Sequence, residues 1–249
     1  MLPKRISLSI FFFCCAVLFS CSGLHAQQDC NAEVKILLLP TDSRAAAATL
    51  GASKESSGRL YFYDSDDLDL LSQGAIVRLR QGPRRDLTVR LRPLSGKKSA
   101  IPSEGSECEV DLTGEGENYS YSISSPFDAG EVPQTGYEIS RLLSRVQTRM
   151  LSGAQVSIDW KRVKRVAEIR STSWQIRDQQ PFGKLTLELW EWPGGTVLEL
   201  STKVPPDAAS AIYSELRQFV KMKHLTMSPV QGLKTTVALE TITGAAPRH

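Results

Sequence analysis

The chain has few of the residues on which many hydrolytic and zinc centres depend. Its 249 residues include three histidines, of which only His224 and His249 lie beyond residue 26, and five cysteines. Three of the cysteines lie within the first 21 residues, which leaves Cys30 and Cys108 in the body of the chain. Neither has a second cysteine or a histidine at zinc spacing. The sequence therefore argues against a zinc site and against a Ser-His-Asp triad.

Long apolar runs are also scarce, and the clearest one spans residues 6–19, directly after Lys4 and Arg5. This run is short for a bilayer span, and basic residues followed by a short apolar run are typical of a secretory signal peptide. A membrane anchor that is retained is the alternative. We expect a signal peptide over residues 1–26 and a single domain over residues 27–249.

The end of this signal leaves two processing sites open. Residues 18–21 (LFSC) resemble a lipoprotein box, which would place a lipid on Cys21, and residues 24–26 (LHA) resemble a signal peptidase site. We expect an exported protein, periplasmic or secreted, that contacts a membrane only if Cys21 carries a lipid.

A large excess of charge of either sign is missing as well. The chain has 30 basic and 27 acidic residues, and removal of residues 1–26 leaves 28 basic against 27 acidic residues. A nearly neutral mature chain argues against nucleic acid as a partner. With 41% hydrophobic residues, the chain is able to bury one sizeable core.

What the chain does have is a regular alternation of charged and apolar residues. The segments that show it are 33–36, 75–80, 87–92, 107–112, 169–176, 184–190 and 196–203. Period-two alternation predicts β-strands, and the turn PGG at residues 193–195 joins the last two into a hairpin. Helices are expected at residues 66–72, 136–151 and 206–223, and loops at 95–105 and 114–126.

Each such strand has an apolar face and a charged face, and the charged face has two possible surroundings. It meets water if the sheet is open, and it lines a lumen if the sheet closes into a barrel. The charges are segregated: two adjacent strands carry Arg78, Arg80, Arg90 and Arg92, and the next strand carries Glu107, Glu109 and Asp111. Guanidinium groups match phosphate oxygens and carboxylates bind hard divalent ions, so this segregation suits a polyanion bound with its metal.

The two remaining cysteines test this register. Cys30 and Cys108 are one residue out of phase with Glu33 and Glu109, so we expect both cysteines on the face opposite to the charges. An oxidising compartment would permit one disulfide between them.

Three short motifs follow one another in the first third of the chain: NAEVK at residues 31–35, YFYDS at 61–65 and LSQGAIVRLR at 71–80. In this order they resemble motifs of the CYTH family of triphosphate tunnel enzymes. The first resembles the family's opening E-x-E-x-K strand, with Asn31 where the first glutamate is expected. The second resembles its aromatic-aromatic-Asp-Thr segment. The third resembles the segment that ends in R-x-R, and this match is the most specific.

The resemblance continues as far as residue 203. Residues 88–90 (TVR) are similar to the T-x-K strand, 107–109 (ECE) to an acidic strand, and 170–174 (RSTSW) to a basic strand that ends in an aromatic residue. Residues 187–189 (LEL) and 197–201 (VLELS) are similar to two late acidic strands. Ser201 stands where the second glutamate of an E-x-E motif is expected.

This resemblance implies an α+β fold, mainly β: an antiparallel, eight-stranded closed tunnel with helices packed outside. It also implies hydrolysis of inorganic triphosphate or of an organic triphosphate such as thiamine triphosphate, or cyclisation of ATP, with Mg²⁺ or Mn²⁺ as cofactor. The matching positions for phosphate binding are Lys35, Arg78, Arg80, Arg90, Arg92 and Arg170, with Lys35 and Arg80 also catalytic. Those for the metal are Glu33, Glu188 and Glu199.

Two other functions remain open from the sequence. A catalytically inactive module that binds polyphosphate or another anion is indicated by Asn31 and Ser201, which replace two expected metal carboxylates. A structural interaction domain is the other alternative, in which the charged strand faces are only solvated.

Overall fold

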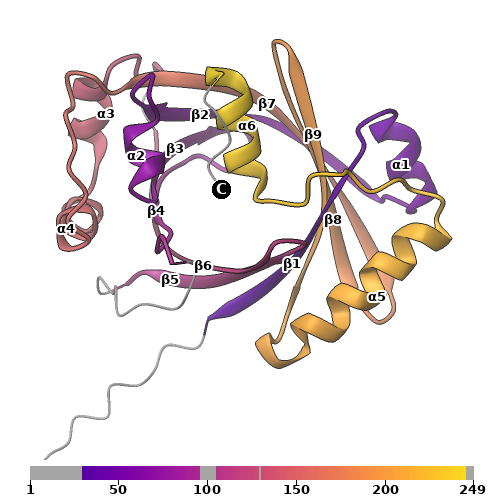
Figure 1. Cartoon of the computed structure of the whole chain (residues 1–249). Helices are drawn as coiled ribbons and strands as arrows, with labels where there is room; N and C mark the ends of the chain where they lie inside the picture. Colours follow the sequence, from indigo (N-terminus) through magenta and orange to yellow (C-terminus); the bar gives the residue numbers. More distant parts are fainter. Residues whose placement is uncertain (1–29, 96–104, 129, 245–249) are drawn as a thin grey trace, which may run out of the picture.

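The computed structural model describes residues 30–95, 105–128 and 130–244. They form a closed β-barrel with helices around it (Figure 1). The expected signal peptide with Cys21, and residues 96–104 of one expected loop, lie outside the described residues. None of the described helices is both long and apolar enough to cross a membrane.

Within the described residues, nine strands close the barrel in the order β1-β5-β6-β4-β3-β2-β7-β8-β9. Their bounds are Asn31–Leu38 for β1, Lys54–Asp64 for β2, Ala75–Gln81 for β3, Asp86–Leu91 for β4, Glu107–Thr113 for β5, Gly116–Pro126 for β6, Lys164–Gln179 for β7, Gly183–Trp192 for β8 and Gly195–Val204 for β9. All neighbours pair in antiparallel fashion except β1 and β5, which are parallel. The expected closed tunnel is confirmed, with nine strands instead of eight and one parallel pair.

The alternation in the sequence left two of these strands unpredicted. One is β2, of which the sequence marked only residues 61–65, as a motif. The other is β6, which occupies the segment 114–126 that was expected to be a loop. Its inward positions include Ser122 and Ser124, which line the barrel interior, whereas Tyr121 and Ile123 are buried on the outer face. Serine is a weak strand former, so the alternation here does not stand out against a polar loop.

Six α-helices and one 3₁₀ turn lie among the described residues. Their bounds are Ser43–Thr49 for α1, Asp69–Ser72 for α2, Gly136–Leu142 for α3, Arg145–Gly153 for α4, Pro206–Ala208 for the 3₁₀ turn η1, Ala209–Met222 for α5 and Lys234–Thr243 for α6. The helix expected at 136–151 is two helices, because Ser144 caps a new one and forms a capping box with Gln147. The sequence did not predict α1 or α6.

The apolar faces of the strands pack outward, beneath the helices. One cluster joins β1 and β8 to α1 and α5, with Ile36, Leu187 and Leu216 fully buried. A second joins β3 and β4 to α3 and α4 and includes Leu79 and Met150. Burial of these side chains is the main favourable term that holds the helices on the barrel.

A third apolar cluster lies inside the barrel, at one end. Leu37 shares the inward phase of Glu33 and Lys35 on β1, and it packs with Phe62, Trp190 and, from α6, Leu239. Figure 1 shows α6 lying across the barrel. The helix therefore closes one end of the interior, and the charged side chains occupy the rest.

Leu79→Ala should lower the free energy of unfolding by about 3 kcal/mol, because it leaves a cavity where a fully buried side chain packs under α3 and α4. Urea denaturation measures this loss. The charged interior should be unaffected, since Leu79 points away from it. A loss below about 1 kcal/mol would mean that the inner and outer faces of β3 are reversed.

Candidate functional site

A cavity of about 250 Å³ lies inside the barrel. Nearly all the residues expected to bind phosphate or metal line it: Glu33, Lys35, Arg78, Arg80, Arg90, Arg92, Glu188 and Glu199. They converge because alternate residues of a strand point to the same face, and each of these residues lies at an inward-facing position of its strand or, for Arg92, just beyond the end of β4. Cys30 and Cys108 are buried on the outer face, as the register predicted, and they form a disulfide.

Arg170 is the exception and does not reach the interior. Its neighbours Ile169 and Ser171 face inward, Ile169 in the cluster below α6 and Ser171 as a donor to Glu188 Oε1 at 2.7 Å. Arg170 is exposed and lines a shallow depression with Trp192 on the outside of the barrel. The predicted phosphate-binding role of Arg170 therefore assumed the wrong face of β7: the inward positions are one residue to either side of it.

Three carboxylates form a cluster across strands β1 and β5. Ligand oxygens of Glu33, Glu109 and Asp111 all lie within 4.8 Å of one another. The ammonium of Lys35 lies among them, 2.6 Å from Asp111 Oδ1, 3.1 Å from Glu33 Oε2 and 3.9 Å from Glu109 Oε1. Ser201 donates a hydrogen bond to Glu33 Oε1 at 2.9 Å. We call these three acids the acid cluster.

The charges in this cluster support one another although they are buried. Burial disfavours the charged form of Asp111, but Lys35, Arg90 and Arg92 outweigh it and hold the pKa of Asp111 well below its usual range. Burial likewise opposes the charge on Lys35, yet Asp111 and Glu33 raise the pKa of its ammonium well above its usual value. Lys35 therefore keeps its proton at any physiological pH and acts as a fixed cation.

The oxygen donors of the acid cluster fit a hard divalent cation, which takes carboxylate ligands. Its central position is shared with Lys35, so an ion must compete with that ammonium. Of the three carboxylates expected to bind metal, only Glu33 belongs to this cluster among the described residues. Glu188 and Glu199 face a different partner.

That partner is Lys234, a site residue that sequence reasoning missed. Its ammonium lies 2.5 Å from Glu188 and 2.8 Å from Glu199, and it sits 4.6 Å above the ring of Trp190. Burial opposes ionisation of Glu188, but Lys234 and Ser171 lower its pKa to about 2. Lys234 is the first residue of α6, and no local sequence signal marks it, because only the packing of α6 brings it to β8 and β9.

The arginines differ in how far their charge is already neutralised. Arg80 makes two hydrogen bonds to Asp86, at 2.8 and 2.6 Å. Arg90 approaches Glu109 at 3.3 Å, and Arg92 approaches Asp111 at 3.7 Å. These three guanidinium groups therefore have carboxylate partners within the protein.

Arg78 has no ion pair among the described residues. Its Nε is buried without a hydrogen-bond partner. Burial, with Arg80 and Arg90 nearby, lowers the pKa of Arg78 to about 9, so the group remains protonated at neutral pH. A buried cation without a partner is costly, and an anion bound beside Arg78 would remove that cost.

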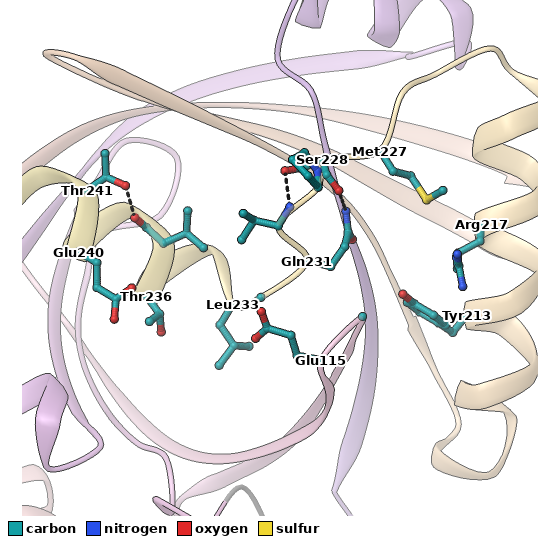
Figure 2. Close-up of a pocket in the computed structure, with 15 residues that line it drawn as sticks. Glu115, Tyr213, Arg217, Met227, Ser228, Gln231, Leu233, Thr236, Glu240 and Thr241 are labelled. Atoms are coloured by element: carbon teal, nitrogen blue, oxygen red, sulfur yellow. Dashed lines mark hydrogen bonds between the residues drawn. The ribbon is translucent and has the colours of Figure 1, made fainter. Parts of the chain in front are cut away.

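A larger cavity, of about 980 Å³, lies outside the tunnel between α5, residues 227–233 and α6 (Figure 2). Its lining includes Glu115, Tyr213 and Arg217, and none of the residues expected to bind phosphate or metal. Leu233 borders both cavities. The convergence of charged residues, and not cavity size, identifies the tunnel as the candidate site.

No protein-family model matches this chain, and no curated protein does. Among solved structures, a Hippeastrum protein described as an adenylyl cyclase candidate with a dominant triphosphatase activity aligns with a TM-score of 0.59 at 21% identity, over 82% of this chain and 93% of its own. An adenylate cyclase candidate from Bacillus halodurans aligns with a TM-score of 0.51 at 13% identity, over 84% of this chain and 97% of its own. At these identities the likeness is one of fold.

Proposed function

We propose that this chain, which has the CYTH-like tunnel fold, binds the triphosphate group of a small molecule inside the barrel and hydrolyses one of its phosphoanhydride bonds. The observation that carries the proposal is Arg78, a buried guanidinium without an internal anion, on a wall that also presents Arg80, Arg90 and Arg92. The acid cluster lies in the same cavity. The triphosphatase activity of the Hippeastrum protein, which shares the fold, supports this choice of substrate class.

Phosphoryl transfer needs charge neutralisation and positioning more than covalent chemistry from the protein. Arg78 supplies the free donors that a phosphate oxygen would accept, and Arg90 and Arg92 extend the positive wall towards the acid cluster. Lys35 holds its proton, so its role is to fix charge beside the substrate and not to act as a base. Arg80 is paired with Asp86, so its guanidinium is less available to bind phosphate than that of Arg78. It contributes to the wall of the tunnel.

Glu33, Glu109 and Asp111 would hold the divalent cation, Mg²⁺ or Mn²⁺ by the hardness of their oxygen donors. When bound, such an ion neutralises phosphate charge and orients a water for attack. Glu188 and Glu199 would join as ligands only if Lys234 moved away.

A second function, binding without hydrolysis, is favoured by one set of contacts. Ser201 stands where a carboxylate was expected and donates to Glu33, while Lys35 and Lys234 already neutralise the acids. Hydrolysis assays with residues 27–249, inorganic triphosphate, thiamine triphosphate and ATP, each with Mg²⁺ and Mn²⁺, separate the two. Binding without release of phosphate from any of the three supports the second function.

Arg78→Met should weaken triphosphate binding by about 1.5–3 kcal/mol, roughly 10- to 150-fold, because a charged hydrogen-bond donor is lost. The fold should be retained, since the change removes an unpaired buried cation. Calorimetric titration with inorganic triphosphate measures the affinity. Arg170→Met, on the outer face, is the matched control and should bind as the wild type does; equal affinities for all three proteins would place the ligand elsewhere.

We also propose that the protein is exported, from the signal-like residues 1–26. Cells fed a labelled fatty-acid analogue should label the protein only if Cys21 is lipidated, and Cys21→Ser should abolish the label. An unprocessed chain in the cytoplasmic fraction would contradict export itself.

A further inference from the structure

The pairing of β1 with β5 is the one parallel contact among the described strands, and it is short. It runs from Asn31 opposite Glu109 to Val34 opposite Leu112. Parallel pairing is slightly less stable per residue than antiparallel pairing. We call this pairing the seam, and Figure 1 shows β5 and β1 meeting there at one side of the barrel.

The acid cluster straddles the seam on its inner face. Glu33 belongs to β1, whereas Glu109 and Asp111 belong to β5, and their ligand oxygens lie within 4.8 Å of one another. Like charges at this separation repel across the seam. Lys35 opposes the repulsion, but an incoming cation competes for the same oxygens.

On the outer face, the Cys30–Cys108 disulfide ties the same two strands together. Cys30 directly precedes β1, and Cys108 is adjacent in sequence to Glu109. Both cysteines are buried, at 7% and 3% exposure, in the cluster beneath α3 and α4. The covalent link therefore holds the strands at the level of the acid cluster, whichever cation occupies the inside.

We propose that this disulfide is a positioning element: it holds Glu33 against Glu109 and Asp111, so that the acid cluster binds a divalent cation tightly only after the bond has formed. The proposal rests on the proposed function in one respect, that this cluster binds a cation.

Formation of the bond is an oxidation. The thiols of Cys30 and Cys108 lose two electrons and two protons to a small disulfide such as oxidised glutathione, which is reduced to two thiols.

Oxidation would then switch on the ion site. A chain made under reducing conditions would carry thiols at Cys30 and Cys108 and an unsupported seam, and export to an oxidising compartment would complete the site. Because the bond is buried, a reductant would reach it only when the seam opens, so the oxidised state would persist.

The test measures Mn²⁺ affinity, by calorimetry and by the EPR signal of free Mn²⁺, for the oxidised protein and for the double variant C30S/C108S. We expect at least about tenfold weaker Mn²⁺ binding in the double variant, the size of effect seen when groups that support metal ligands are removed. A second double variant, C30A/C108V, keeps apolar contacts in the outer cluster and should show the same loss of Mn²⁺ affinity. It provides the measurement if C30S/C108S folds poorly.

Leu79→Ala is the matched control, because Leu79 packs in the same outer cluster but lies on β3, away from the seam. It should lose stability and keep the Mn²⁺ affinity of the wild type. Wild-type Mn²⁺ affinity in both cysteine variants, or an equal loss in Leu79→Ala, would overturn the positioning role alone. No Mn²⁺ binding by the oxidised protein would overturn the metal site of the proposed function, and the positioning role with it.

Discussion

Asp111→Asn should lower the free energy of unfolding by about 3–5 kcal/mol, the usual range when one partner of a buried ion pair is removed. Asp111 is completely buried and is the shared anion of Lys35, Arg90 and Arg92. Asparagine preserves the shape of the side chain, but it removes the charge and replaces one acceptor oxygen by an NH₂ donor. Three cations would then face one another with two carboxylates, Glu33 and Glu109, left to neutralise them.

Asp69→Asn is the matched control for Asp111→Asn. Asp69 pairs with Arg162 at 2.9 Å, but this pair is about half exposed on the surface. Solvent-exposed pairs are worth about 0–1 kcal/mol, so the control should barely change the urea midpoint. Similar losses in the two variants would mean that the barrel interior is solvated like the surface, and that the acid cluster is not a buried site.

Lys234→Met should have an effect of the same size, about 3–5 kcal/mol, for the opposite reason. It removes the cation that Glu188 and Glu199 share and leaves two carboxylates beside each other in the interior. Methionine keeps an unbranched apolar side chain, so the loss reports on the charge, including the contact of the ammonium with the Trp190 ring. Thermal unfolding should show a lower Tm.

A divalent ion should restore part of this loss, because the released carboxylates become ligands and binding to the folded state alone stabilises it. Mn²⁺ should therefore raise the Tm of Lys234→Met more than that of the wild type. Lys164→Met is the control: Lys164 pairs with Asp66 at 2.8 Å but is half exposed, so its loss should stay below about 1 kcal/mol. An unchanged Tm in Lys234→Met would show that α6 does not deliver its lysine into the tunnel.

Much of the site was predictable because strand alternation fixes which side chains share a face. Arg78 and Arg80 on β3, and Arg90 on β4, point inward with the phase that the sequence indicated. Arg170 shows the limit of a short motif: between Ile169 and Ser171 the alternation is ambiguous, and one residue of slip reverses the face. Strand β6 was missed for a related reason: with Ser120, Ser122 and Ser124 on one face, its alternation is hard to distinguish from the composition of a polar loop.

Contacts made by distant segments could not be predicted. Lys234 reaches Glu188 and Glu199 only because α6 folds across the end of the barrel, and nothing in the sequence around residue 234 indicates that position. The pairing of Arg80 with Asp86 is a more local contact that depends on the tight turn between β3 and β4. Among the described arginines that line the tunnel, it leaves Arg78 without an ion pair. The break between α3 and α4 had a local signal, the S-x-x-Q capping box at Ser144.

A crystal structure of the protein grown with inorganic triphosphate and Mn²⁺ would test directly whether the tunnel binds both. We expect phosphate density beside Arg78 inside the barrel, and an anomalous manganese peak among Glu33, Glu109 and Asp111. Ligand density confined to the outer cavity between α5 and α6, or an empty barrel in crystals grown at saturating triphosphate, would contradict this expectation.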